Sequence, residues 1–190
     1  MRKLMILMAA IAALGVMAVS ASGASAATEW TDNGTVVKSG VDLTQTFEGF
    51  LKFEVKGAGT FGCETTVKAT VRGPLSAEIT EFNPTTSTCV GTGAFVGCKL
   101  TADKSNVPWT ITNGTTTLTA TKTGGNITIT NTYNEGCALF GSPPLEFASI
   151  TITPAGTNPI TSLSISGTLT SGGVASGSVT PESTKTLGLK

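Results

Sequence analysis

The sequence predicts an all-β protein, an antiparallel β-sandwich with a closed β-barrel as the alternative. Apolar and polar residues alternate over many short segments: Val67 and Val71 share one face of such a segment, while Lys68 and Arg72 share the other. This period of two is typical of a strand with one buried face, and no window of the chain has the apolar spacing of an amphipathic helix. Turn residues separate the segments at short intervals, which is the pattern of two packed sheets or of a barrel.

The same criteria place each strand in order along the chain. The stretch 134–144, rich in Gly and Pro, is expected to form a long loop, and the residues after Pro181 are expected to be frayed. Strands are expected at 34–39, 46–56, 61–72, 76–82, 94–101, 107–112, 115–122, 126–133, 147–153, 161–170 and 174–180.

The middle of the chain has the clearest hairpin signals. Asn113-Gly114 predicts a two-residue turn that sets Trp109 opposite Leu118. A second turn at 124–125 would add the strand that carries Ile129 and complete a three-stranded antiparallel meander. In this register Trp109 belongs to the core.

Residues 1–27 have the layout of a cleaved secretory signal. A short basic start precedes an uncharged apolar run from Leu4 to Val19, and small residues ending near Ala26 follow. The apolar run is shorter than the roughly 20 residues that a membrane anchor requires. We therefore expect residues 28–190 to form a single exported β domain, secreted or retained in the cell envelope, with no membrane insertion of the mature chain.

The four cysteines, Cys63, Cys89, Cys98 and Cys137, all lie in the exported part. An even number of cysteines in an oxidising compartment favours two disulfides, and sequence alone leaves three connectivities open. We prefer Cys89 with Cys98, because the glycines between them let this short segment fold back on itself. Cys63 would then pair with Cys137.

The charge balance and the residue types that are missing exclude several functions. Without Arg2 and Lys3 the chain has 10 basic and 12 acidic residues, so a nucleic-acid partner, which requires a basic surface, is not expected. The absence of histidine from the sequence excludes Ser-His-Asp and Cys-His catalysis and the common zinc hydrolase sites. We expect no metal site and no cofactor, because the sequence lacks clustered metal ligands.

Carboxylates are the remaining candidates for catalysis, and a glycosidase needs two of them across a cleft. Glu78 and Glu81 are the nearest pair in sequence, but their odd spacing predicts opposite faces of one strand. Glu48, Glu54 and Glu64 could meet only through the fold. We therefore expect the protein not to be an enzyme.

Two aromatic residues are candidates for contact with a partner at the surface. Trp30 lies near the new N-terminus, and Phe140 lies in the loop that contains Cys137. Their positions outside the expected strands distinguish them from Trp109, which follows Pro108 at the start of a strand and has a cross-strand partner.

The segments Gly62–Pro74, Ser87–Cys98 and Val107–Thr110 resemble the small Thr/Gly-rich exported β proteins of actinobacteria. The resemblance implies no activity. The sequence therefore predicts an exported, non-catalytic structural or binding β domain, whose extracellular or cell-envelope partner the sequence does not identify. A carbohydrate-binding module or a carbohydrate-active enzyme is the alternative.

Overall fold

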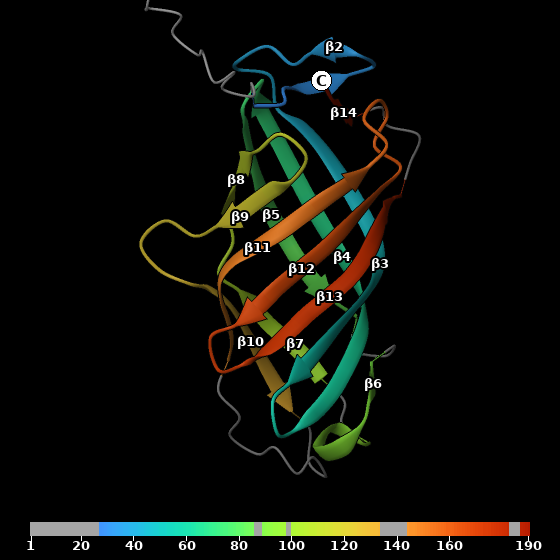
Figure 1. Cartoon of the computed structure of the whole chain (residues 1–190), viewed down its shortest axis with the longest axis vertical. Coiled ribbons are helices and arrows are strands. Elements are labelled where there is room, and N and C mark those ends of the chain that lie inside the picture. The colour runs from blue at the N-terminus through green and yellow to red at the C-terminus, as the bar shows by residue number, and fades with distance from the viewer. Residues whose placement is uncertain (1–26, 86–88, 98–99, 134–143, 183–186) are drawn as a thin grey trace, which may run out of the picture.

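The computed structural model describes residues 27–85, 89–97, 100–133, 144–182 and 187–190. These residues form antiparallel strands and one short 3-10 helix (Figure 1). The elements are β1 (Trp30–Asp32), β2 (Thr35–Val36), β3 (Leu43–Val55), β4 (Gly59–Gly73), β5 (Ser76–Pro84), β6 (Val90–Gly91), η2 (Gly93–Phe95), β7 (Leu100–Ser105), β8 (Trp109–Asn113), β9 (Leu118–Thr121), β10 (Ile127–Tyr133), β11 (Leu145–Ala155), β12 (Ser162–Leu169), β13 (Gly173–Pro181) and β14 (Leu187–Leu189).

Eight of these strands close into a barrel. Hydrogen-bonded neighbours follow the order β12-β13-β3-β4-β5-β8-β9-β11, and β11 pairs again with β12. In Figure 1, β11, β12 and β13 slant across the front of this barrel. The prediction of an antiparallel all-β fold is confirmed. The sandwich that we expected first is not confirmed, and the structure takes the alternative, the closed barrel.

The wall between β5 and β11 is built from two different strand pairs. At one end, β5 pairs with β8 through Ala77–Ile79, and β11 pairs with β9 through Ile150–Ile152. Toward the other end, β11 pairs with β10 through Leu145–Phe147, and β10 pairs with β7. There the Ser105 hydroxyl donates a hydrogen bond of 3.3 Å to the Phe82 carbonyl, which connects β7 to β5. The hairpin β8–β9 and the pair β7–β10 therefore share one sector of the wall.

Two glycines on the inner face help to explain why the sheet curls into a barrel instead of splitting into two sheets. A Cβ at Gly49 of β3 would lie 2.1 Å from the carbonyl oxygen of Ser178, and one at Gly177 of β13 would lie 2.2 Å from that of Phe50. Positions without a side chain allow paired strands to bend and to approach this closely. The sequence alone does not show that glycine is required at these two positions, because the requirement depends on the pairing of β3 with β13.

Apolar side chains fill the interior of the barrel. Residues on the inner faces are buried and their neighbours in sequence point outward, as the period of two predicts. The largest fully buried side chains are Trp30, Trp109, Phe47, Phe53, Phe95, Phe147, Leu51, Leu118, Ile127, Ile129, Leu169 and Val71. Because these groups occupy the inside, the candidate functional sites lie on the outer surface.

Trp109 is part of this core, which confirms the sequence prediction. Its side chain is 0% exposed, and its ring lies 5.2 Å from that of Phe82. The indole Nε1 donates a hydrogen bond of 2.9 Å to Asn106 Oδ1, which also accepts one of 3.0 Å from the amide of Thr128. Asn106 thereby satisfies the buried indole and ties β8 to β10.

The predicted hairpin registers are wrong, although the predicted faces are right. Leu118 lies opposite Asn113, not Trp109, because the loop between β8 and β9 has four residues and the amide of Gly114 bonds to the carbonyl of Thr117. The register shift is an even number of residues, so Trp109 and Leu118 still face the core. The predicted meander is also not formed, because β9 pairs with β11 and not with β10. At the predicted second turn, the described chain forms only an isolated bridge between Lys122 and Gly125.

One end of the barrel is covered by β1, β2 and β14, which we call the cap. Trp30 pairs with Leu189, so the two ends of the described chain are joined in one small sheet (Figure 1). The tail after Pro181, expected to be frayed, thus contains a buried strand.

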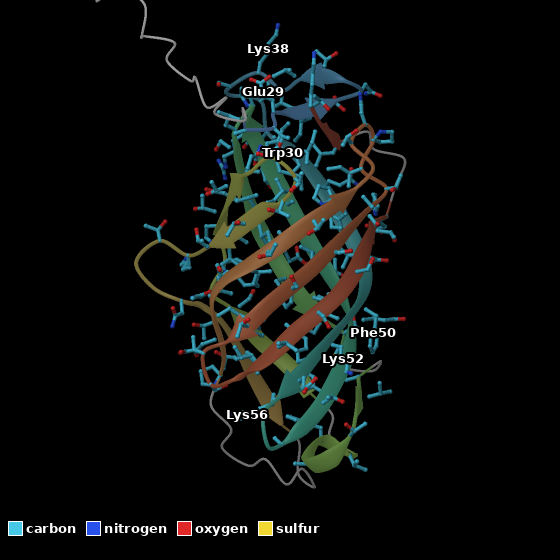
Figure 2. The ribbon with its side chains drawn as sticks, viewed as in Figure 1. Glu29, Trp30, Lys38, Phe50, Lys52 and Lys56 are labelled. Atoms are coloured by element: carbon cyan, nitrogen blue, oxygen red, sulfur yellow. A yellow bond between two sulfur atoms is a disulfide. The ribbon has the colours of Figure 1, made fainter. Side chains whose placement is uncertain are left out.

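The exposure expected for Trp30 is also wrong: its side chain is 2% exposed, and Figure 2 shows it beneath the cap. Its amide donates a hydrogen bond of 2.7 Å to the carbonyl of Pro74.

Residues 89–97, which we call the strap, lie across the opposite end. A strand was expected at 94–101, but η2 occupies its first part and β7 begins only at Leu100. Three glycines between 91 and 97 disfavour an extended strand here, and two of them have positive φ. The helix places Phe95 inside the barrel, where its ring centroid is 4.9 Å from that of Phe61. Phe61 also stacks on Phe53 at 4.9 Å, so aromatic side chains fill this end.

A disulfide between Cys63 and Cys89 attaches the strap to β4. Both preferred pairings, Cys89 with Cys98 and Cys63 with Cys137, are therefore wrong; Cys98 and Cys137 lie outside the described residues. The physical reason is the course of the chain after β5. β5 leaves the edge of β4 at Thr65, β6 joins the same edge at Gly62, and Cys63 lies between these points.

Replacing Cys63 and Cys89 together with alanine should lower the free energy of unfolding by about 3.5 kcal/mol, because the bridge closes a loop of 26 residues. Chemical denaturation of the variant and of the natural chain measures this difference. Peptide mapping without reduction is the independent check and should recover the Cys63 peptide joined to the Cys89 peptide. A Cys63 peptide joined to one that carries Cys98 or Cys137 would contradict the fold of the strap.

Candidate functional site

The outer surface of β3, β4 and β5 is the charged side of the barrel. Arg72 lies 3.3 Å from a carboxylate oxygen of Glu78 and 3.7 Å from one of Asp42, and Lys68 forms an ion pair with Glu81. All of these groups are partly exposed to water, so each pair contributes little to stability. These carboxylates face cations, which makes them poor candidates for acid-base catalysis.

Glu78 and Glu81 do not lie on opposite faces of β5, which corrects the sequence prediction. The pairing with β4 shifts between Lys68, which is opposite Glu81, and Ala69, which is opposite Ile79. This bulge inserts one extra residue and turns Glu81 to the same outer face as Glu78. The alternation of buried residues in the sequence did not contain a signal for the bulge.

The fold brings Glu48 and Glu64 to one shallow groove on this charged side. The groove has a volume of about 330 Å³ and runs over β3, β4 and the residue after β5. Glu54 is not part of it and lies beside a second hollow near the turn between β3 and β4. We call the first one the acidic groove; its lining consists of Glu48, Gly49, Phe50, Glu64, Thr65, Thr66 and Thr85.

Phe50 is the aromatic member of the acidic groove and is 43% exposed. Figure 2 shows it on the outside of the barrel, near Lys52 of the same strand. A Cβ at Gly62 would come within 2.4 Å of the Phe50 ring, so the ring lies directly over that glycine. An aromatic ring that covers a cross-strand glycine stabilises the sheet, which gives Phe50 a structural role whether or not it binds a ligand.

Most of the residues singled out from the sequence do not meet in a site. Trp30 is buried beneath the cap, and Phe140, Cys98 and Cys137 lie outside the described residues. Sequence reasoning did not select Phe50 for the acidic groove. Its position opposite Glu64 and its contact with Gly62 follow from the register of β3 and β4, which alternation alone does not define.

Two further observations complete the description of the site. In the part of the chain that the structure describes, no helix is long and apolar enough to cross a membrane. Comparison with known proteins found no matching family model, no similar curated protein and no similar solved structure. The surface chemistry of this barrel is therefore the guide to its function.

Proposed function

We propose that the chain is an exported, non-catalytic β-barrel domain that acts through its outer surface as a structural or binding component outside the cell membrane. The observation that supports this proposal best is the interior packed with apolar side chains, which leaves shallow outer surfaces for contact with other molecules. The carboxylates of β5 are paired with cations. Such a surface suits binding better than proton transfer in a cleft that excludes water.

Export is supported by the backbone hydrogen bonds of the residues that directly follow the expected signal. The amide of Thr28 bonds to the Gly114 carbonyl, and Glu29 exchanges two backbone hydrogen bonds with Lys190. The barrel therefore incorporates the chain from the first residues after the expected signal. The disulfide between Cys63 and Cys89 is compatible with an oxidising compartment.

N-terminal sequencing of the secreted protein tests export directly. We expect Ala27 or Thr28 as the first residue, because the small residues before them form the cleavage pattern. Recovery of the chain from the membrane fraction with Met1 intact would contradict the proposal.

A second disulfide, between Cys98 and Cys137, completes the proposed framework. With Cys63 bonded to Cys89, these are the two remaining cysteines of the chain. The supporting observation is the pairing of Leu100 with Tyr133 across β7 and β10, because each cysteine lies only a few residues from one of them. Thiol titration of the unfolded, unreduced protein should find no free thiol, and two free thiols would exclude this bond.

The acidic groove supports a second candidate function, that of a carbohydrate-active enzyme. Glu48 and Glu64 line one groove on adjacent strands, as the two carboxylates of a glycosidase do. Incubation of the purified protein with polysaccharides should release no reducing sugar if the domain is non-catalytic. Release that disappears in Glu48→Gln and Glu64→Gln variants, but persists in the Glu54→Gln control, would establish the enzyme instead.

A further inference from the structure

The side of the barrel away from β4 presents a surface with a single charged strand residue among those described. The described strands β8, β9, β12 and β13 contain no Asp, Glu, Lys or Arg, and β11 contains only Glu146 near its start. Their outward positions are mainly Ser and Thr. By contrast, the ion pairs described above join side chains of β4 and β5, together with Asp42, which directly precedes β3. The barrel therefore has one charged side and one neutral side covered with hydroxyl groups.

Five of these hydroxyl residues are in register across five adjacent strands. Thr112 of β8 is opposite Thr119 of β9, which is opposite Thr151 of β11. Thr151 is opposite Ser166 of β12, and Ser166 is opposite Ser176 of β13. We call this row the hydroxyl ladder. Neighbouring strands lie about 4.8 Å apart, so the ladder follows the curved wall of the barrel for about 19 Å.

A shallow hollow of about 340 Å³ lies over β11, β12 and β13, and three members of the ladder line it. The pairing of β11 with β12 shifts between Phe147 and Ile150, which forms a bulge at Ala148 and Ser149. Gly167 of β12 contributes no side chain beside this bulge. The hollow is lined by Ala148, Ser149, Thr151, Ser166, Gly167, Thr168, Val174, Ala175 and Ser176, none of which is charged.

The chemistry of this surface selects among possible partners. Nucleic acids and acidic polymers require cations, which the ladder and the hollow lack. Stable protein partners use aromatic side chains and Arg at the centre of their interfaces, and neither type lines the hollow. A hydroxyl group both donates and accepts hydrogen bonds, as do the hydroxyl groups of a sugar. A row of such groups at regular spacing matches an extended, uncharged, hydroxyl-rich polymer.

We propose that the hydroxyl ladder and its hollow bind a neutral polysaccharide. The proposal rests on the binding function proposed above and assigns it a ligand class and a surface. The polymer lies across β8, β9, β11, β12 and β13, bonded to the ladder directly and through water. The acidic groove on the opposite side takes no part in this contact. Because no ion pair forms, raised salt leaves the binding unchanged.

The test is sedimentation of the purified mature chain with insoluble neutral glycans, namely cellulose, chitin and a β-1,3-glucan. Thr119→Val combined with Thr151→Val removes two neighbouring hydroxyls of the ladder and keeps the shape and the strand preference of the side chains. The matched control combines Thr44→Val with Thr46→Val on β3 of the charged side, where both residues point outward and neither lines the acidic groove. Circular dichroism confirms that each variant is folded.

We expect the natural chain to sediment with at least one of these glycans, and the ladder variant to bind about tenfold more weakly. The control should bind as the natural chain does. Failure to sediment with any of the three, equal binding by the ladder variant, or a loss confined to the control would overturn the proposal. These outcomes leave the proposed function intact. Release of reducing sugar, or recovery of the chain from the membrane fraction with Met1 intact, would instead contradict the proposed function and leave the proposal for the hydroxyl ladder unaffected.

Discussion

Replacing Trp109 with alanine should destabilise the protein by about 3–5 kcal/mol, a large part of the roughly 5–15 kcal/mol that holds such a domain together. The indole is completely buried, packs on Phe82, and donates its hydrogen bond to Asn106. The substitution leaves a cavity and removes one of the two donors that bond to the Asn106 side-chain oxygen. Denaturant unfolding followed by circular dichroism measures the effect.

Trp30→Ala should have an effect of similar size, because this side chain is also buried. Val174→Ala is the control, since Val174 is 46% exposed on β13, and it should change stability by no more than about 0.5 kcal/mol. In the Trp30→Ala variant Trp109 is the single remaining tryptophan, so its fluorescence should report an apolar environment. Emission typical of a solvent-exposed indole would contradict the described core.

Deleting Leu187–Lys190 should cost about 3–6 kcal/mol and open the cap end of the barrel. Leu187 and Leu189 are 6% and 5% exposed, and burial of such a side chain contributes about 1.5–3 kcal/mol. The deletion also removes the strand partner of Trp30 and the two backbone bonds between Glu29 and Lys190. Trp30 emission should shift to longer wavelength as water reaches the indole.

The same unfolding measurement on Leu75→Ala provides the control for this deletion. Leu75 is 55% exposed, and it follows Pro74, whose carbonyl accepts the Trp30 amide bond. A leucine lost from the surface near the cap should leave the midpoint almost unchanged. If the deletion behaved like Leu75→Ala, the small sheet of β1, β2 and β14 would not be holding the two ends of the chain together.

The strands themselves were largely predictable, because alternation is a local property. The segments expected at 61–72 and 174–180 correspond to β4 and β13, each extended by one or two residues at its ends. Trp30 was misjudged because its neighbours in the fold, Leu187 and Leu189, come from the far end of the sequence. No local pattern near residue 30 could indicate that a buried strand forms there.

The register and the cysteine pairing needed information that the sequence does not carry locally. The bulge in β5 reversed the expected face of Glu81, and the four-residue loop after Asn113 moved its hairpin by an even number of positions. The even shift of the hairpin left the same side chains facing the core, whereas the one-residue bulge in β5 changed which side chains face outward. The candidate surfaces depend on the same information: Glu48 and Glu64 line one groove through the register of β3 and β4, and Thr119 lies opposite Thr151 only because β9 pairs with β11.

The sheet closes on itself, and this closure leaves the proposed binding surfaces on the outside. Backbone NOEs from NMR of the folded chain test it most directly at two pairings between strands distant in sequence. We predict cross-strand contacts between Thr119 and Thr151, across β9 and β11, and between Lys52 and Ser176, across β3 and β13. Absence of either set, with both strands still formed, would show an open sheet or a sandwich and contradict the closed barrel.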